Sequence, residues 1–288
     1  PPIEGGGLVD RLGRLPDGMP MFDAPYSSYQ RARGEARVAL GPDGKVISLF
    51  QSGSAKAMLP RTHGPCPEVV FLNTSGGLTG GDALSLSLDV AAGATAMAAT
   101  QTAERAYASP EGAAAVQVNL SVGEGGTLFW LPQETILFQR SALDRTTRVS
   151  LGQDARFLGL ETVVLGRAEM GERLTTTDFR DARHIFGAEG RIQHAEQIEI
   201  CEDALLRSGH PAGLDGATVL STLVYVGDDA EDRVEPLRRR LGDGAAASAW
   251  DGRLVVRVMG TDSWHVRQGL IPAIRFLTND HLPRVWQT

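Results

Sequence analysis

The chain has 288 residues, with 28 Lys and Arg against 35 Asp and Glu, and a formal net charge of −7. An acidic chain without a basic cluster is a poor candidate for nucleic-acid binding, which depends on neutralising phosphates. No apolar run approaches the roughly 18 residues needed to span a bilayer. Cys66 and Cys201 lie far apart and form no Cys-x-x-Cys pair, so no disulfide framework is expected. We therefore expect a cytoplasmic protein with neither nucleic-acid nor membrane partners.

The first part of the chain divides into an arm and a β-rich body. Residues 1–28 are rich in Gly and Pro and predict an irregular N-terminal arm. Residues 35–40 and 45–50 flank a Gly-Pro-Asp-Gly turn and predict a hairpin. Over residues 29–215, short alternating runs separated by glycine-bearing turns predict a sandwich, a barrel or a stacked-sheet solenoid. No fixed repeat supports a strict hexapeptide β-helix.

The C-terminal part, residues 216–288, has a different pattern. Residues 218–226 and 254–259 predict strands, and residues 229–241 predict a helix. Asp262 is placed to cap a second helix with apolar residues on one face. We expect a small strand-helix-strand-helix part packed on the body.

The most distinctive stretch is the loop from Asn73 to Asp82, which contains Gly76, Gly77, Gly80 and Gly81. It has neither the G-x-G-x-x-G spacing of a dinucleotide site nor the spacing of a P-loop. Apolar residues then recur at every second position, which predicts a strand. The loop therefore joins two strands and offers no helix N-terminus to a phosphate.

Several acids interrupt apolar runs, and these are the candidates for chemistry. They are Asp82, Glu134, Glu161, Glu172 and Glu196. Such a carboxylate lies either on the solvent face of a strand or faces a hydrated or ligand-lined interior, and the first is more frequent because an unpaired buried charge is costly. The apolar neighbours of Glu161 make it the least suited of the five to a surface. His63 and Cys66 are the only pair of soft donors with ligand spacing, and no zinc or hydrolase motif is present.

Four stretches together resemble the UreD (also called UreH) urease accessory proteins. They are Asn73 to Asp82, Leu131-Pro132-Gln133-Glu134-Thr135-Ile136, Leu165-Gly166-Arg167 with Met170-Gly171-Glu172, and the terminal Leu282-Pro283-Arg284-Val285-Trp286-Gln287-Thr288. Their order and spacing match along nearly the whole chain from about residue 30.

The resemblance implies a non-enzymatic chaperone for nickel insertion into urease. It would act with apo-urease, with accessory protein F and, through F, with accessory protein G. The implied fold is a mainly β, right-handed helical stack of mixed sheets with a small C-terminal part carrying two helices. The implied cargo is transient Ni²⁺ in an internal tunnel, with no permanent cofactor. Asp82, Glu161 and Glu196 fall where the family tends to carry acids, and Glu172 and Glu134 are further candidates for that path.

The chain also departs from the family pattern. Thr74 replaces a usual proline, Arg105 a usual lysine and Ala106 an aromatic residue, which leaves Tyr107 alone. Partner contacts are assigned to Arg105, Tyr107, Arg284 and Trp286. A tail bearing Trp and Arg is more often docked on its own protein than used as an interface anchor, although both types are enriched in hot spots.

Two rival hypotheses remain open. One is a carboxylate-pair hydrolase on a β-solenoid or sandwich, with Glu134 and Glu161 as the pair; the low aromatic content argues against a sugar-binding groove. The other is a binding module whose acids are all solvated. The nickel-path hypothesis predicts that Ala at Asp82, Glu161 or Glu196 lowers urease activation while the fold and partner binding persist.

Overall fold

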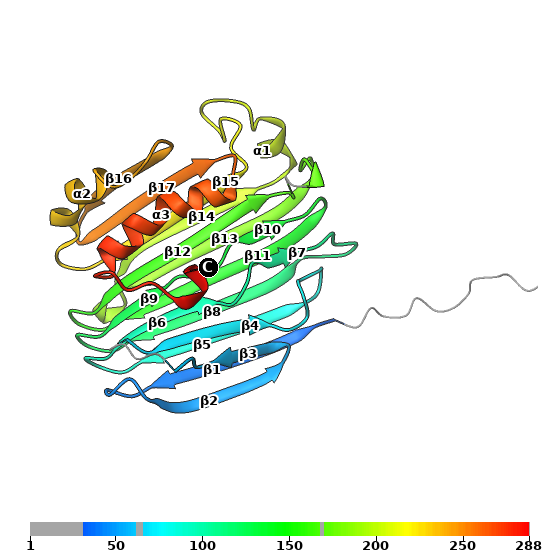
Figure 1. The fold of residues 1–288 in the computed structure, drawn as a ribbon. Coiled ribbons are helices and arrows are strands. Elements are labelled where there is room, and N and C mark those ends of the chain that lie inside the picture. Colours follow the sequence, from blue (N-terminus) through cyan, green and yellow to red (C-terminus); the bar gives the residue numbers. More distant parts are fainter. Residues whose placement is uncertain (1–30, 62–65, 168–169, 288) are drawn as a thin grey trace, which may run out of the picture. The chain divides into compact units, whose positions relative to one another are not determined.

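The structure, a computed structural model, describes residues 31–61, 66–167 and 170–287, and its strands form two sheets (Figure 1). The seven-stranded sheet has the order β14 (Ile192–Ile200), β13 (Thr177–Phe186), β11 (Ser141–Leu151), β8 (Ala114–Val122), β5 (Ala83–Val90), β1 (Arg33–Leu40) and β2 (Val46–Gly53). The ten-stranded sheet has the order β16 (Ala245–Trp250), β17 (Arg253–Gly260), β15 (Val219–Val226), β12 (Arg156–Leu165), β9 (Thr127–Trp130), β6 (Thr95–Thr100), β4 (Glu68–Asn73) and β3 (Ala55–Met58). Off this path, β10 (Thr135–Leu137) pairs with β12, and β7 (Glu104–Ala106) pairs with β10.

From β4 to β13 the chain winds as a solenoid. It alternates between the two sheets, and each return to a sheet adds a strand parallel to the previous one, as in β5, β8, β11 and β13. The ends of the stack are antiparallel, where β1 pairs with β2 and β13 with β14. The described residues from Arg31 onward form one compact unit. The predicted mainly β stack is therefore confirmed, whereas the arm predicted over residues 1–28 lies outside the described residues.

Strict alternation of residue types produces these strands. In β8, buried and exposed residues alternate along all nine positions, because successive side chains point to opposite faces. The turns between coils stack closely: a Cβ at Gly123 would lie 2.5 Å from the Ala92 nitrogen, and a Cβ at Gly152 would lie 2.6 Å from the Glu124 nitrogen. Glycine at these two turns lets neighbouring coils approach to strand spacing.

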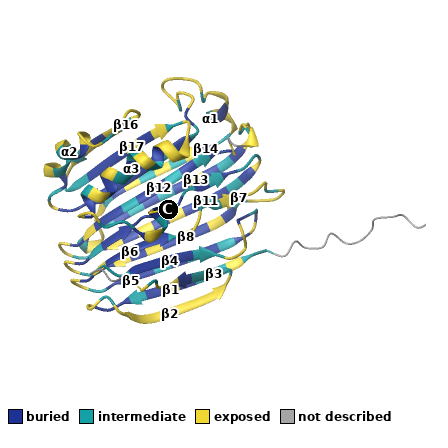
Figure 2. Cartoon of the chain, in the orientation of Figure 1, coloured by how far each residue is buried: buried dark blue, intermediate teal, exposed yellow. Residues whose placement is uncertain are grey.

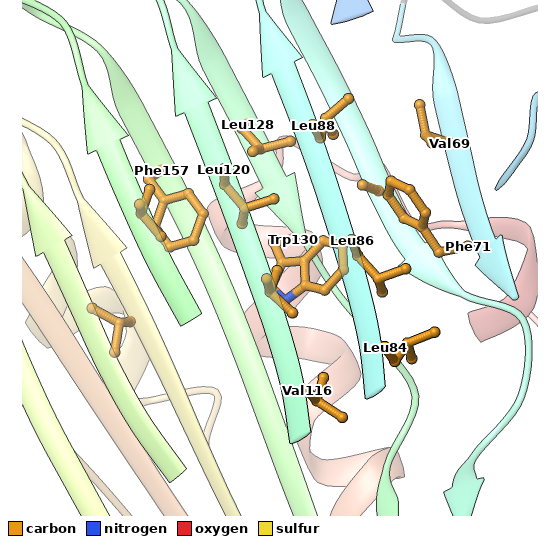
Figure 3. Packing of buried hydrophobic residues seen from close by; sticks show 14 of the residues in the cluster. Val69, Phe71, Leu84, Leu86, Leu88, Val116, Leu120, Leu128, Trp130 and Phe157 are labelled. Atoms are coloured by element: carbon orange, nitrogen blue, oxygen red, sulfur yellow. The ribbon is translucent and has the colours of Figure 1, made fainter. Parts of the chain in front are cut away.

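The main core lies between the sheets. Leu84, Leu86 and Leu88 of β5 face Phe71 of β4 and Trp130 of β9 (Figure 3). The rings of Phe71 and Trp130 are 6.0 Å apart and tilted by 59°. Full burial of one such large apolar side chain contributes about 1.5–3 kcal/mol.

A second core lies on the outer face of the ten-stranded sheet, where helices cover β15 and β17 (Figure 1). These helices are α2 (Ala230–Arg238) and α3 (Ser263–Leu277), whereas the short helix α1 (Glu202–Leu206) contacts β14 and adds Leu205 to the main core. Asp262 caps α3 as predicted, because its side chain accepts a hydrogen bond from the His265 N–H at 2.9 Å. The C-terminal region also holds an unpredicted strand, β16, and its β15 pairs directly with β12. No helix in the described ranges is both long and apolar enough to cross a membrane.

Within the described residues, the strand at each end of a sheet pairs on one side only. At one end of the stack, every residue of β2 is exposed (Figure 2), and the side chain of Ile47 is 70% exposed. At the other end, the edges are β14 and β16.

Candidate functional site

Charged side chains enter the core from strands of the seven-stranded sheet. Buried and exposed residues alternate along β11, and the inward, buried positions carry Leu143, Arg145, Thr147 and Val149. Arg145 therefore occupies a buried position where an apolar residue is expected. On β13 the same parity places Asp181 and Arg183 inward. Strand register then aligns the charges, because Arg145 lies opposite Asp181 and Arg183 lies opposite Glu196 of β14.

These residues form a chain of alternating charges, named here the ion-pair chain: Glu161, Arg145, Asp181, Arg183, Glu196 and Arg257. Arg145 Nη1 lies 2.7 Å from Glu161 Oε2, and its Nε and Nη2 donate to the two oxygens of Asp181 at 2.9 and 3.0 Å. Arg183 lies 3.4 Å from Asp181 and 2.6 Å from Glu196. Three carboxylates and three guanidinium groups thus balance to zero net charge.

The ion-pair chain runs from the core to the surface and links the two sheets. At its inner end, Glu161 of β12 accepts a hydrogen bond from Trp130 Nε1 at 3.1 Å. At its outer end, Arg257 of β17 donates to Glu196 Oε1 at 2.5 Å. The side chain of Asp181 is 0% exposed, whereas that of Arg257 is 60% exposed. Arg257 is therefore the charge that solvent or another protein reaches first.

Burial and pairing set the protonation of the inner members. Burial raises the pKa of Glu161, and Arg145 acts against this shift while Asp181 adds to it. For Asp181, burial acts to raise the pKa, but attraction and hydrogen bonds from Arg145, together with Arg183, lower it overall. Asp181 is thus the fixed anion of the ion-pair chain, and Glu161 is the carboxylate that takes up a proton more readily.

A cavity of about 20 Å³ lies beside Glu161 and is also lined by Thr147, Arg183 and His194. This is room for about one water molecule. The Thr147 hydroxyl and His194 Nε2 are buried and have no hydrogen-bond partner within the described part of the chain. The surface of the cavity is mostly apolar, and the space is too small for a hydrated metal ion, so any ion that passes here must first displace side chains.

His194 of β14 contributes a neutral imidazole next to the ion-pair chain. Its Nε2 lies 4.0 Å from Glu196 Oε2. Burial, with repulsion from Arg183, Arg253 and Arg257, lowers the pKa of His194 to about 4. The ring is therefore uncharged near neutral pH, the form in which imidazole binds metals.

Of the five predicted acids, Glu161 and Glu196 belong to the ion-pair chain, joined through Arg145, Asp181 and Arg183. Asp82 does not. It is buried, and its carboxylate accepts hydrogen bonds from the Ala32 N–H at 2.7 Å and the Thr79 N–H at 2.9 Å. These contacts hold the end of the glycine loop against the chain that enters β1, so the visible role of Asp82 is structural.

Glu172 and Glu134 also lie outside the ion-pair chain. Glu172 receives two hydrogen bonds from the Arg167 side chain, at 2.9 and 3.2 Å, and this pairing lowers its pKa. Glu134 is half-buried and lies within electrostatic reach of Arg267 from α3, on the helix-covered side of the sheet. Glu161 faces the opposite side, toward Arg145. The geometry does not form the Glu134 and Glu161 pair that the hydrolase hypothesis requires.

The glycine loop packs against the segment that carries Arg105 and Tyr107. The Tyr107 hydroxyl donates to the Gly76 carbonyl at 3.2 Å, and Leu78 forms a parallel bridge with Ala106. At Gly77, with φ of +150°, a Cβ would lie 2.3 Å from the Tyr107 ring. Glycine at this position is therefore explained by close contact within the chain, and Asn73 fixes the loop start by accepting from the Ser75 N–H at 3.1 Å.

The C-terminal tail is docked on the ten-stranded sheet. Trp286 is 4% exposed, its Nε1 donates to the Leu131 carbonyl at 2.9 Å, and Arg267 lies over its ring. Arg284 is exposed, and its backbone N–H donates to Glu68 at 3.2 Å. Burial of Trp286 leaves Arg284 as the tail residue able to meet a partner, and their assignment to partner binding stays a prediction.

The soft-donor pair cannot be assessed, because His63 lies outside the described residues. Cys66 is half-buried, and burial raises the pKa of its thiol to about 12. Across the described ranges, no group of three or more His, Cys, Asp or Glu residues is arranged to hold a metal ion. Any metal contact at the ion-pair chain is therefore not a preformed site.

Sequence reasoning missed Arg145, Asp181, Arg183 and His194. One signal was available, namely a charged residue on the inward parity of an otherwise alternating strand. The partners of these charges are set by register between strands of different coils, which the sequence alone does not reveal.

Comparison with known proteins identifies the family. Residues 32–287 match the family described as UreD urease accessory protein. The chain belongs to the UreD family. It is 49% identical to the urease accessory protein UreD of Cereibacter sphaeroides over 269 residues, covering 91% of this chain and 98% of that one. It is 46% identical to that of Paracoccus denitrificans, covering 93% and 97%, and 39% identical to that of Agrobacterium fabrum, covering 89% and 92%. Membership in the UreD family supports a role in urease maturation.

Proposed function

We propose that this chain is a non-catalytic chaperone of urease maturation that takes part in nickel insertion. In this proposal it acts in the cytoplasm, binds apo-urease and accessory protein F, and meets accessory protein G through F. The observation that carries the proposal is the ion-pair chain, which extends from Glu161 in the core to Arg257 at the surface.

The ion-pair chain supplies ligands of the right strength for a cargo. Carboxylates and a neutral imidazole bind Ni²⁺, and few or scattered ligands release it more readily than a closed cluster does. Glu161, Asp181 and Glu196 provide the carboxylates, and His194 provides the imidazole.

Electrostatics require that arginines move as nickel passes. The ion-pair chain is neutral, and adding two positive charges to a buried site is costly unless cations leave. Arginine does not lose its proton at physiological pH. Each Ni²⁺ must therefore displace guanidinium groups from the carboxylates it meets, and Arg257 moves first because its side chain is the most exposed.

Two measurements test the proposal. The first is co-purification of this chain with apo-urease and with accessory protein F, and the second is nickel-dependent urease activity with and without this chain. The proposal predicts that both partners are retained and that activity requires the chain. Activation that proceeds equally well without it would refute the role in nickel insertion.

A further inference from the structure

The ten-stranded sheet extends beyond the seven-stranded sheet at the end of the stack where β14 and β16 lie (Figure 1). Along β16, Ala245, Ala247 and Ala249 face the helices. Ala246, Ser248 and Trp250 face the other way, toward the space between the sheets, and all three are exposed. The inner face of β16 therefore has no strand of the seven-stranded sheet opposite it.

This overhang forms a groove of about 480 Å³ between β14 and the hairpin of β16 and β17. Its lining includes Gln193 and His194 of β14, Ser248 and Trp250 of β16, and Arg253 and Arg257 of β17. Among the described strands, β14 has a ladder partner on one side only. Along its other edge the Gln193 carbonyl accepts a hydrogen bond from Arg253 at 2.5 Å, so a strand that pairs there must take this position from the arginine. A further strand beside β14 would occupy the groove and cover the inner face of β16.

Two arginines line the groove although the protein is acidic, and each has an acid nearby: Glu196 for Arg257 and, at 3.9 Å, Asp251 for Arg253. Its charged lining residues are Arg253 and Arg257, with no carboxylate among the lining residues. Arg253 lies 4.7 Å from the centre of the Trp250 ring, and Trp250 is 41% exposed. An exposed tryptophan beside two arginines is a composition enriched in interface hot spots.

Two residues that line the groove carry buried polar atoms without partners. Gln193 Oε1 and His194 Nε2 receive no hydrogen bond within the described part of the chain, and His194 is 8% exposed. Such atoms are costly to leave unpaired, but both are closed off from the groove, so a ligand pairs with them only if the Gln193 and His194 side chains turn outward.

We propose that an extended, acidic segment of a partner protein lies in this groove, pairs with the free edge of β14 and places carboxylates on Arg253 and Arg257. Backbone pairing supplies the affinity, and the alternating side chains supply the specificity, as in other strand-addition complexes. The small side chains of Ala246 and Ser248 leave room for the residues that face β16.

Docking in the groove would also change the ion-pair chain at its outer end. This effect on the ion-pair chain rests on the proposed function, whereas the docking itself does not. Arg257 is bound to Glu196, whose other partner is Arg183. A partner carboxylate that takes Arg257 leaves Glu196 with one guanidinium fewer. Partner binding thereby creates an excess of negative charge at the outer end of the ion-pair chain, which favours a cation there.

Amide hydrogen exchange on the full chain tests the proposal, with apo-urease, accessory protein F and accessory protein G added in separate arms. We expect one partner to slow exchange in β14 by at least about tenfold and to protect β16. Complexes that form with every partner but leave β14 unprotected would overturn the proposal. Protection that rises with the concentration of this chain alone would instead assign the groove to a second copy.

Two substitutions at one exposed position test the charge of the occupant. Ser248→Glu is expected to weaken that partner's binding about tenfold, whereas Ser248→Lys retains or strengthens it. The matched control is Arg275→Glu on α3, whose side chain is 48% exposed and which does not line the groove. Equal affinities for the Glu and Lys variants would overturn the acidic assignment. These are binding measurements, so they separate this proposal from a failure of nickel transfer.

Discussion

Arg145 is the residue on which the buried charges depend most. Its guanidinium contacts Glu161 at 2.7 Å and Asp181 at 2.9 and 3.0 Å, and the three side chains are 8%, 5% and 0% exposed. Arg145→Met removes the positive charge and leaves two buried carboxylates, with only Arg183 still near Asp181. Breaking a buried pair in this way costs about 3–5 kcal/mol. That is a large share of the roughly 5–15 kcal/mol that stabilises a typical domain.

Replacing the whole triad should be far less harmful. The variant Arg145→Met, Glu161→Leu, Asp181→Leu removes all three charges and fills the space with apolar atoms, a change that is often neutral or stabilising. Trp130 Nε1 loses its acceptor, which costs about 1–3 kcal/mol, and Arg183 keeps only Glu196 as its ion-pair partner. We therefore expect the triple variant to regain most of the stability that the single variant loses.

Urea unfolding at neutral pH, followed by circular dichroism, measures both free energies. A triple variant as unstable as Arg145→Met would refute the electrostatic reasoning. The same triple variant also separates stability from function, because the proposed nickel path lacks its inner carboxylates. We expect it to fold but to fail in urease activation, and full activation would reduce the triad to a structural role.

Three further predictions concern other parts of the molecule. Because the pKa of His194 is lowered from 6.5 to about 4, its contribution to stability is present above pH 6.5 and is lost as the pH falls toward 4, by at most about 3 kcal/mol. Urea unfolding at pH 7 and pH 5 checks this. The unsubstituted protein should lose more stability between the two pH values than His194→Gln does. Gly77→Ala should destabilise the protein by about 2–4 kcal/mol, because the added Cβ meets the Tyr107 ring. Gly76 has a φ of +81° and open space around it, so Gly76→Ala should cost only about 1 kcal/mol. Equal shifts in the thermal unfolding temperature of the two variants would contradict this. An exposed edge strand such as β2 can pair with another copy of the protein, so Ile47→Lys should reduce self-association measured by light scattering without changing the free energy of unfolding. Unchanged association would show that β2 does not mediate it.

The fold could be predicted where local pattern decides it. Alternation located the strands, and the Gly-Pro-Asp-Gly turn located the first hairpin, now β1 and β2. The resemblance supplied the stacked arrangement. β16 was missed because Ala245–Trp250 is mostly alanine, which carries little strand signal, and it forms only by pairing with β17.

The candidate acids were chosen by their neighbours along the chain, and their part in a nickel path stays a prediction. That search found Glu161 and Glu196 but gave equal weight to Asp82, whose carboxylate fastens a loop. The arginines that neutralise the acids come from other coils of the solenoid. Their contacts depend on long-range register, so local sequence does not show which buried acid is paired.

The central claim is that the ion-pair chain carries nickel during urease maturation. Its most direct test is the nickel content of urease purified after activation in the presence of the unsubstituted chain, Glu161→Gln, Glu196→Gln or the control Glu199→Gln. Glu199 is on β14 like Glu196, but its side chain is 53% exposed and outside the ion-pair chain. The account predicts about tenfold less nickel with Glu161→Gln and Glu196→Gln, unchanged co-purification of partners, and full loading with the control. Equal nickel content in all four samples would contradict it.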